Sequence, residues 1–294
     1  MSQKAPLLVQ LQQYATTHQV TLPVFSDVAR RLQDASRSDA YDIEAIERAI
    51  DSDPALAVEV LRAANSAFFG GLSEITSIRA AITRLGLQQV THLALMATEK
   101  NRYVAHQPRL APLMRDLWQH AAACALASEW IAKRLRYPQL ADEAFIGGLL
   151  HDVGKIGVPD AILNKPGKLT AEEFDIVRRH EAVSVEILTR IDFLEPVAPS
   201  ATSEAHAMPT DAEDTDRPIE PFIVAVVDAY DAMTSTRSYR KALPQETAFE
   251  ELRKNAGRQF HPVVVEALIA ALTRAGARHG AGFEAEPHAF AVEP

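Results

Sequence analysis

A histidine and an aspartate, His151 and Asp152, stand side by side directly after the apolar run FIGGLL. Burying both would cost several kcal/mol unless another group compensated them. A second candidate, His120, lies on the expected helix RDLWQHAAACALASEW, where helical spacing puts Asp116 and Cys124 on the same face. Imidazole and carboxylate groups that share a site are typical metal ligands, so this pattern predicts a metal centre.

Further imidazole and carboxylate groups follow along the chain. They are His180, expected to end the amphipathic helix AEEFDIVRRHEA, His206 in an irregular segment, and Asp228 with Asp231 on the apolar segment PFIVAVVDAYDAMTS. Two metal ions held by such ligands can activate a hydroxide and clamp both reacting oxygens of a phosphodiester. Lys155, one turn beyond the histidine–aspartate pair, is placed to stabilise phosphate charge. Imidazole and carboxylate ligands suit iron, manganese or zinc. We therefore expect one or two divalent ions, with iron or manganese preferred, beside a phosphate-binding lysine.

Each residue also has a simpler interpretation. A single histidine such as His180 is more often a hydrogen-bonded polar residue than a ligand, and Asp228 fits an ordinary helix-end carboxylate. Cys124 fits a small core residue better than a ligand. A cluster of three cations, Arg237, Arg240 and Lys241, follows the second aspartate segment. It is either a solvated helix end or a phosphate-binding group, since arginine binds phosphate in a bidentate manner.

Composition limits the classes of function. The 294 residues carry a net charge of −9, which argues against a broad nucleic-acid surface. The segment IRAAITRLGLQQVTHLAL has helix–glycine–helix spacing reminiscent of a helix-turn-helix, but its second helix is apolar, so no DNA partner is expected. No stretch is apolar and long enough to span a membrane, and the N-terminus does not resemble a signal peptide. With a single cysteine, the chain is expected to be cytoplasmic.

Apolar residues recur at helical intervals along most of the chain, which predicts an all-α fold. Asp53 followed by Pro54 is a typical helix start, Thr170 with Glu173 fits a capping box, and Gly86 is expected to separate two helices. Residues 196–221 are rich in proline, serine, threonine and acids and are expected to form a long loop.

Two long segments resemble the HD superfamily of metal-dependent phosphohydrolases, and more closely its HD-GYP branch, which hydrolyses cyclic di-GMP. They are LLHDVGKIGVPDAILNKPGKLTAEEFDIVRRH and VVDAYDAMTSTRSYRKALPQETAFEELRKNAGRQFHPVVVEAL. The resemblance implies metal ligands at His120, His151, Asp152, His180, His206 and Asp228, with Asp116 where trinuclear members carry a glutamate. It also implies catalytic roles for Lys155 and Asp152, and phosphate binding by Arg237 and Arg240.

One segment departs from the HD-GYP pattern. Where that branch has two histidines and a glutamate before a Gly-Tyr-Pro stretch, this chain reads EAHAMPTDAEDTDRPIEP. Ala205 replaces the first histidine, Ala207 replaces the glutamate, and the Gly-Tyr-Pro stretch is missing. The resemblance therefore implies a site with one ligand fewer.

The N-terminal half resembles the HDOD domain, a regulatory relative found in bacterial signalling proteins. The resemblance rests on a Leu-Pro, an Asp-Pro-Ala-Leu, an Ala-Asn-Ser-Ala and a closing Leu-Gly over roughly residues 22–98. The expected organisation is an N-terminal helical HDOD subdomain (1–105), a multi-helix HD-superfamily bundle with the metal site (106–275) and a flexible tail (276–294).

Two functions follow from these resemblances. The first is a signalling module of HDOD type that keeps an HD metal site and acts through a protein partner. Its expected ligand is a cyclic dinucleotide or another nucleotide, and its expected assembly is a homodimer. The alternative is an active metal-dependent phosphodiesterase that uses a metal-activated hydroxide.

Overall fold

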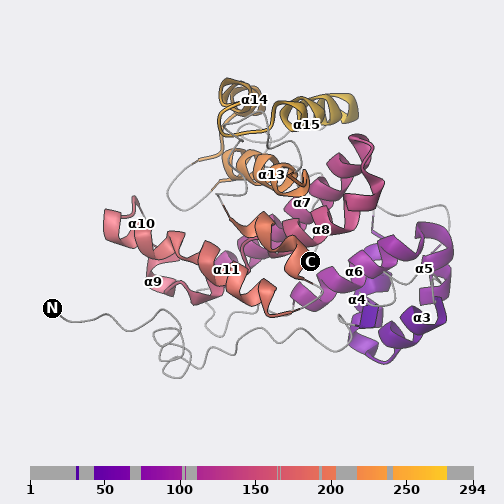
Figure 1. Ribbon diagram of the computed structural model, residues 1–294. Helices are drawn as coiled ribbons and strands as arrows, with labels where there is room; N and C mark the ends of the chain where they lie inside the picture. Colours follow the sequence, from indigo (N-terminus) through magenta and orange to yellow (C-terminus); the bar gives the residue numbers. More distant parts are fainter. Residues whose placement is uncertain are drawn as a thin grey trace. The chain divides into compact units, whose positions relative to one another are not determined.

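The computed structural model describes residues 31–32, 43–66, 74–100, 103, 111–163, 165, 167–191, 194–202, 217–236 and 241–276. The chain divides into two compact units, Met1–Arg102 and Tyr103–Pro294 (Figure 1). Every regular element among these residues is a helix, apart from one isolated bridge between Ala256 and Phe260. This confirms the all-α prediction. None of the described helices is long and apolar enough to cross a bilayer.

The described part of the first unit contains a group of short helices: α3 (Ile43–Asp51), α4 (Pro54–Ala64), α5 (Ile78–Leu85) and α6 (Leu87–Lys100). The expected start of α4 is confirmed, because Asp53 Oδ1 accepts hydrogen bonds from the backbone N–H groups of Ala55 and Leu56 at 3.0 and 3.1 Å. Gly86 separates α5 from α6 with a φ of 85°, a conformation that favours glycine. Most of α6 is buried, which does not suit a DNA recognition helix.

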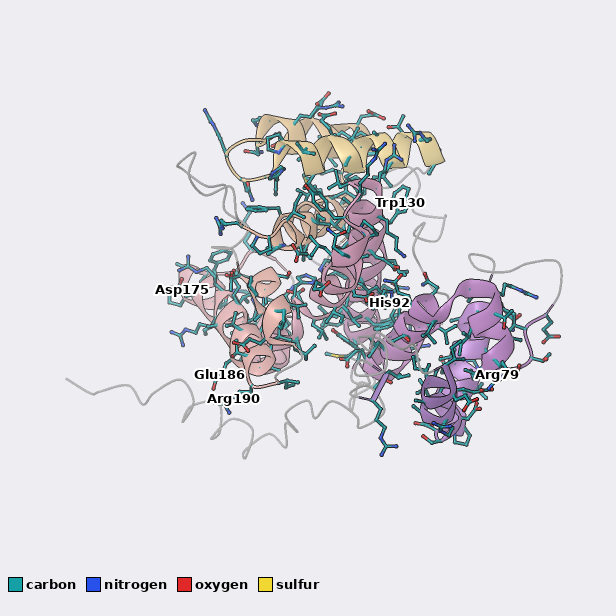
Figure 2. The ribbon with its side chains drawn as sticks, turned by 45° about the vertical axis from the view of Figure 1, so that its right-hand side comes forward. Arg79, His92, Trp130, Asp175, Glu186 and Arg190 are labelled. Carbon is teal, nitrogen blue, oxygen red and sulfur yellow. The ribbon has the colours of Figure 1, made fainter. Side chains whose placement is uncertain are left out.

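The Ala-Asn-Ser-Ala motif has a structural role in this unit. The Asn65 side chain donates to the carbonyl of Ile75 and accepts from its N–H, both at 2.8 Å. These two bonds tie the end of α4 to the segment that leads into α5. On the surface, Arg79 of α5 pairs with Glu47 of α3 (Figure 2).

The second unit is built on three helices, α7, α8 and α13, which pack against one another. Its elements are α7 (Ala111–Arg134), η2 (Pro138–Leu140), α8 (Ala141–Leu150), η3 (Val153–Gly157), α9 (Asp160–Leu163), α10 (Ala171–Arg178), α11 (His180–Thr189), η4 (Glu195–Ala201), α13 (Glu220–Thr234), α14 (Gln245–Lys254) and α15 (Pro262–Ala275). In Figure 1, α14 and α15 lie together over α13, and their apolar faces complete one continuous core with α7.

Helices α7 and α8 approach very closely because of a glycine. A Cβ atom at Gly148 would lie 2.6 Å from the carbonyl oxygen of Cys124 on α7. This close contact brings the C-terminal end of α8 against the middle of α7, where His120 lies.

Two sequence expectations in this unit are corrected. His180 does not end the helix of residues 171–178; it begins α11, after a break at Arg179. The expected loop over 196–221 starts as a 3-10 helix, η4, and its last residues already belong to α13. The capping box of Thr170 and Glu173 is confirmed. The remaining residues of the expected loop, 203–216, and the tail from 277 lie outside the described part of the chain.

Candidate metal centre

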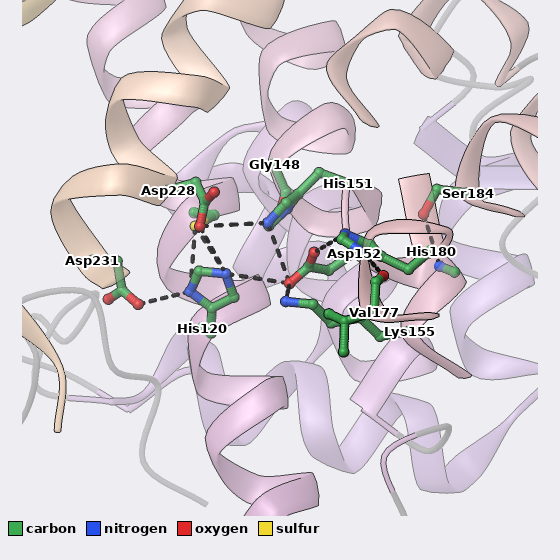
Figure 3. Close-up of polar contacts among 12 residues, drawn as sticks. His120, Gly148, His151, Asp152, Lys155, Val177, His180, Ser184, Asp228 and Asp231 are labelled. Carbon is green, nitrogen blue, oxygen red and sulfur yellow. Dashed lines mark hydrogen bonds and ion pairs between the residues drawn. The ribbon is translucent and has the colours of Figure 1, made fainter. Parts of the chain in front are cut away.

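Five elements of the second unit bring imidazole and carboxylate groups to one place (Figure 3). His120 comes from the middle of α7, and His151 and Asp152 come from the junction of α8 with η3. His180 is the first residue of α11, and Asp228 lies on α13. These side chains are far apart along the chain but lie close together in the fold, and their role as metal ligands stays a prediction.

The junction between η3 and α11 depends on a second glycine. A Cβ atom at Gly154 would lie 2.1 Å from the carbonyl oxygen of His180, so no other residue fits without a backbone shift. The Gly154 N–H donates to Ser184 Oγ at 2.8 Å. These contacts hold the start of α11, and with it His180, against Asp152.

The three imidazoles are oriented in the same way. Each Nδ1 lies at hydrogen-bond distance from an oxygen outside the cluster. The three contacts are His120 to Asp231 Oδ2 at 2.7 Å, His151 to the Gly148 carbonyl at 2.9 Å, and His180 to the Val177 carbonyl at 2.7 Å. Since carbonyl and carboxylate oxygens only accept, each Nδ1 carries a hydrogen and each Nε2 is turned into the cluster. Metal-binding histidines are held in this manner by acceptors behind them.

The Nε2 atoms converge on two carboxylates. His120 Nε2 lies 3.2 Å from Asp228 Oδ1 and 3.5 Å from Asp152 Oδ2. His151 Nε2 lies 3.5 and 3.9 Å from the same two oxygens. His180 Nε2 lies 3.2 Å from the other oxygen of Asp152. Nitrogen and oxygen ligands at these separations surround a space that a divalent ion fits.

One atom of this cluster is a buried polar group without a hydrogen-bond partner. His151 is only 6% exposed, and its Nε2 has no hydrogen bond. Leaving such an atom unsatisfied costs about 1–3 kcal/mol. A metal ion would remove this cost, because ligating atoms of His120, Cys124, His151 and Asp228 all lie within 4.8 Å of one another. The residues present therefore fit a divalent metal.

The protonation states of two residues also suit a cation. Burial lowers the pKa of His151, which keeps its imidazole neutral. Burial alone would raise the pKa of Asp152, but the charge of Lys155 and the neighbouring imidazoles hold that pKa well below its usual range. Neutral imidazole and ionised carboxylate are the forms that bind metal.

His120 has a different environment. Burial opposes its protonation, yet the charges and hydrogen bonds of its neighbours, the carboxylates of Asp152, Asp228 and Asp231 among them, raise its pKa well above the ordinary value. The Cys124 thiol, 3.8 Å from His120 Nδ1, has its own pKa raised by burial to about 11 and is neutral near pH 7. The raised pKa favours the protonated imidazole of His120, and a bound cation would displace its Nε2 proton.

A cavity of about 510 Å³ opens onto this cluster. One wall carries His151, Asp152, Lys155, His180 and Asp228. The small side chains of Ala225, Ala229 and Ala232 on α13 leave room in the cavity, and Phe260 and its neighbours after α14 contribute another part of the lining. A volume of this size suits a small-molecule ligand.

The other predicted site residues have different outcomes. Lys155 forms an ion pair with Asp152 and lines the cavity, and its phosphate-binding role stays a prediction. Asp116 is exposed on α7 and does not belong to the four-residue group that could hold an ion. His206, Arg237 and Arg240 lie outside the described residues.

Sequence reasoning had not given Asp231 a specific role. It is the acceptor behind His120, one helical turn after Asp228 on α13. Its place among apolar residues was the available signal, since a carboxylate on such a face needs a partner.

A known protein family matches this chain. The HDOD domain family matches residues 22–189, more than half of the sequence. The chain therefore belongs to the HDOD family, which confirms the resemblance predicted from its N-terminal motifs. The match begins in the first unit and continues to the end of α11, so it includes His120, His151, Asp152 and His180.

Curated relatives match part of the chain. A cyclic di-GMP phosphodiesterase of Thermotoga maritima is 37% identical over 152 residues, which are 48% of this chain and 41% of that protein. A 3'3'-cGAMP-specific phosphodiesterase 2 of Vibrio cholerae is 40% identical over 127 residues, which are 41% of this chain and 24% of that protein. The chain thus spans less than half the length of either relative.

Solved structures share the fold. An HDOD domain protein of unknown function from Geobacter sulfurreducens superimposes with a TM-score of 0.63 and 17% identity, over 92% of this chain and 96% of that one. At this identity the match shows the fold alone.

Proposed function

We propose that this HDOD protein is a signalling module that binds a divalent metal ion in its second unit and, beside the ion, a nucleotide phosphodiester. The observation that carries the proposal is the buried Nε2 of His151, which has no hydrogen-bond partner and faces two carboxylates. The proposed ligands are His120, His151, Asp152, His180 and Asp228. His206 and Asp116 stay predicted ligands.

The ion would supply positive charge and Lewis acidity toward a phosphate oxygen. Iron or manganese is the proposed identity, because imidazole and carboxylate ligands suit these metals and the only cysteine nearby is a neutral thiol. Lys155 lines the same cavity and adds a cation for the phosphate. The names of the curated relatives support a cyclic dinucleotide as the ligand.

Hydrolysis of that phosphodiester is the second candidate. It is favoured by the retained His-Asp pair and by Lys155, which lies in contact with Asp152 and faces the cavity. In that reaction Lys155, with Arg237 and Arg240 as predicted, would hold phosphate oxygens. Ala205 and Ala207, which replace two polar residues of the HD-GYP pattern, favour binding without turnover.

The test separates binding from turnover. Manganese-loaded protein is titrated with cyclic di-GMP by calorimetry, and the mixture is then analysed for linear product by chromatography. We expect saturable binding that the double variant His151→Ala/Asp152→Ala loses while its circular dichroism stays helical. Equal binding by the double variant would contradict the proposal. Product formed by the wild type and lost in the double variant would establish hydrolysis.

The proposed signalling role also implies a partner, an assembly and a location in the cell. We propose a protein partner that responds to the ligand state of the second unit, a homodimer as the functional assembly, and the cytoplasm as the location.

A further inference from the structure

The turn between α14 and α15 is tightly fixed by its own backbone. The Asn255 carbonyl accepts from the N–H groups of Arg258, Gln259 and Phe260 at 3.2, 2.9 and 3.2 Å, and the Gly257 N–H donates to the Phe260 carbonyl at 2.8 Å. Gly257 has a φ of 78°, which favours glycine and closes the turn. The backbone positions from which the side chains of this turn project are therefore set by the fold.

These side chains line the same cavity as the metal centre. Phe260 is buried and anchors the turn in the core, whereas Arg258 and Gln259 are exposed. The Arg258 guanidinium makes no hydrogen bond or ion pair with any residue of the described ranges. Its neighbour Arg253, by contrast, holds Glu266 with two hydrogen bonds of 2.8 and 3.1 Å.

The two cations that line the cavity have different surroundings. Lys155 is paired with Asp152, which is 9% exposed. Arg258 is exposed. A phosphate bound at the metal centre would contact the ion and Lys155, so Arg258 is available to another part of the ligand.

We propose that Arg258 binds a second phosphate of the ligand while the first lies at the metal centre. The site would thereby favour ligands with two phosphates over ligands with one. Arginine suits this role, because its planar guanidinium gives two hydrogen bonds to a phosphate and keeps its charge when partly exposed. This inference rests on the proposed binding of a phosphodiester beside the ion.

The test compares two probes and two variants of the manganese-loaded full chain. Cyclic di-GMP carries two phosphates, and bis(4-nitrophenyl) phosphate carries one. Arg258→Ala should weaken cyclic di-GMP binding on the order of tenfold, as expected for one lost charge-assisted contact, and leave the single-phosphate probe unchanged. The matched control is Arg274→Ala, an exposed arginine in the last turn of α15 outside the cavity lining, which should change neither affinity.

The outcomes distinguish this inference from the proposed function. If the wild type binds the single-phosphate probe but Arg258→Ala leaves cyclic di-GMP affinity unchanged, the inference is wrong and the proposed function stands. Equal weakening of both probes would also overturn it, because Arg258 would then contact the phosphate at the metal centre. If the wild type binds neither probe, the proposed function fails and this inference fails with it. Arg258→Lys should give an intermediate affinity for cyclic di-GMP, since the charge remains but the paired hydrogen bonds do not.

Discussion

Asp231 shows how a residue that need not ligate a metal can determine whether its neighbour does. Its Oδ2 lies 2.7 Å from His120 Nδ1 and turns the Nε2 of that ring toward Asp228 and Asp152. The other two imidazoles are fixed by backbone carbonyls, which no side-chain substitution can remove. His120 is thus the ligand whose orientation depends on a single side chain.

Asp231→Ala is therefore expected to weaken metal affinity by about 10–100-fold, because His120 loses the acceptor that fixes its tautomer and ring position. The measurement is a competition titration of manganese against a fluorescent chelator. Asp175→Ala on α10, an exposed aspartate shown in Figure 2, is the control and should bind metal as the wild type does. Unchanged affinity in Asp231→Ala would mean that His120 is not a ligand.

The Glu220 carboxyl at the start of α13 is buried. Burial raises its pKa above the ordinary 4.5, and Glu143 adds to the rise. A carboxyl whose pKa is raised in the folded state stabilises the fold at low pH and loses that contribution as pH rises through the raised pKa. Glu220→Gln should therefore raise the free energy of unfolding at pH 8, by up to about 1 kcal/mol.

Urea unfolding at pH 8 and at pH 4 measures this effect. Most of the gain should disappear at pH 4, where the carboxyl is mostly neutral in both folded and unfolded chains. Glu250→Gln on the exposed face of α14 should change stability at neither pH. A Glu220→Gln variant that is less stable at pH 8 would show that the ionised carboxylate is favourably bound in the fold.

At the scale of helices, the contact between α7 and α8 connects packing to the metal centre. Gly148 contacts the backbone of Cys124. His120 lies one turn before Cys124 on α7, and His151 lies one turn after Gly148 at the end of α8. Gly148→Ala should destabilise the fold by about 1–3 kcal/mol, because a backbone atom cannot move aside as a flexible side chain can. It should also weaken metal binding, since the two histidines move apart.

Thermal unfolding and metal titration of the same variant measure both effects. Gly276→Ala is the control, since φ is 64° and a Cβ there meets nothing within 4 Å. It should lose about 1 kcal/mol of stability and keep metal affinity. Metal affinity unchanged in Gly148→Ala would show that the cluster tolerates separation of the two helices.

Helix ends were predictable where their signals are local. Asp53, Thr170 with Glu173, and Gly86 act on residues within one turn, so the sequence contains the whole interaction. The start of α11 was not predictable in this way. Arg179 keeps helical angles (φ −64°, ψ −16°) and neither proline nor glycine marks the break, so the apolar pattern runs through it.

At the scale of the whole chain, the sequence indicated the residue types of the candidate metal centre but not the groups that support them. His120, His151, Asp152, His180 and Asp228, which the HD resemblance implies as ligands, lie close together in the fold, and their ligand role stays a prediction. The acceptor role of Asp231 joins residues that are 111 positions apart, and the cavity position of Arg258 depends on how α14 and α15 pack on α13. Both require the folded chain.

The family match spans residues 22–189, so it includes part of each compact unit. The Thermotoga maritima phosphodiesterase aligns with this chain over 152 residues, which are 41% of that protein. We propose binding ahead of turnover because Ala205 and Ala207 replace two polar residues of the HD-GYP pattern.

The metal content of the chain tests this account most directly. Protein purified without oxygen or chelators is analysed for metals beside the double variant His151→Ala/Asp152→Ala. We predict about one to two iron or manganese ions per wild-type chain and none in the folded double variant. A wild type without metal, or a double variant with the same content, would contradict the account.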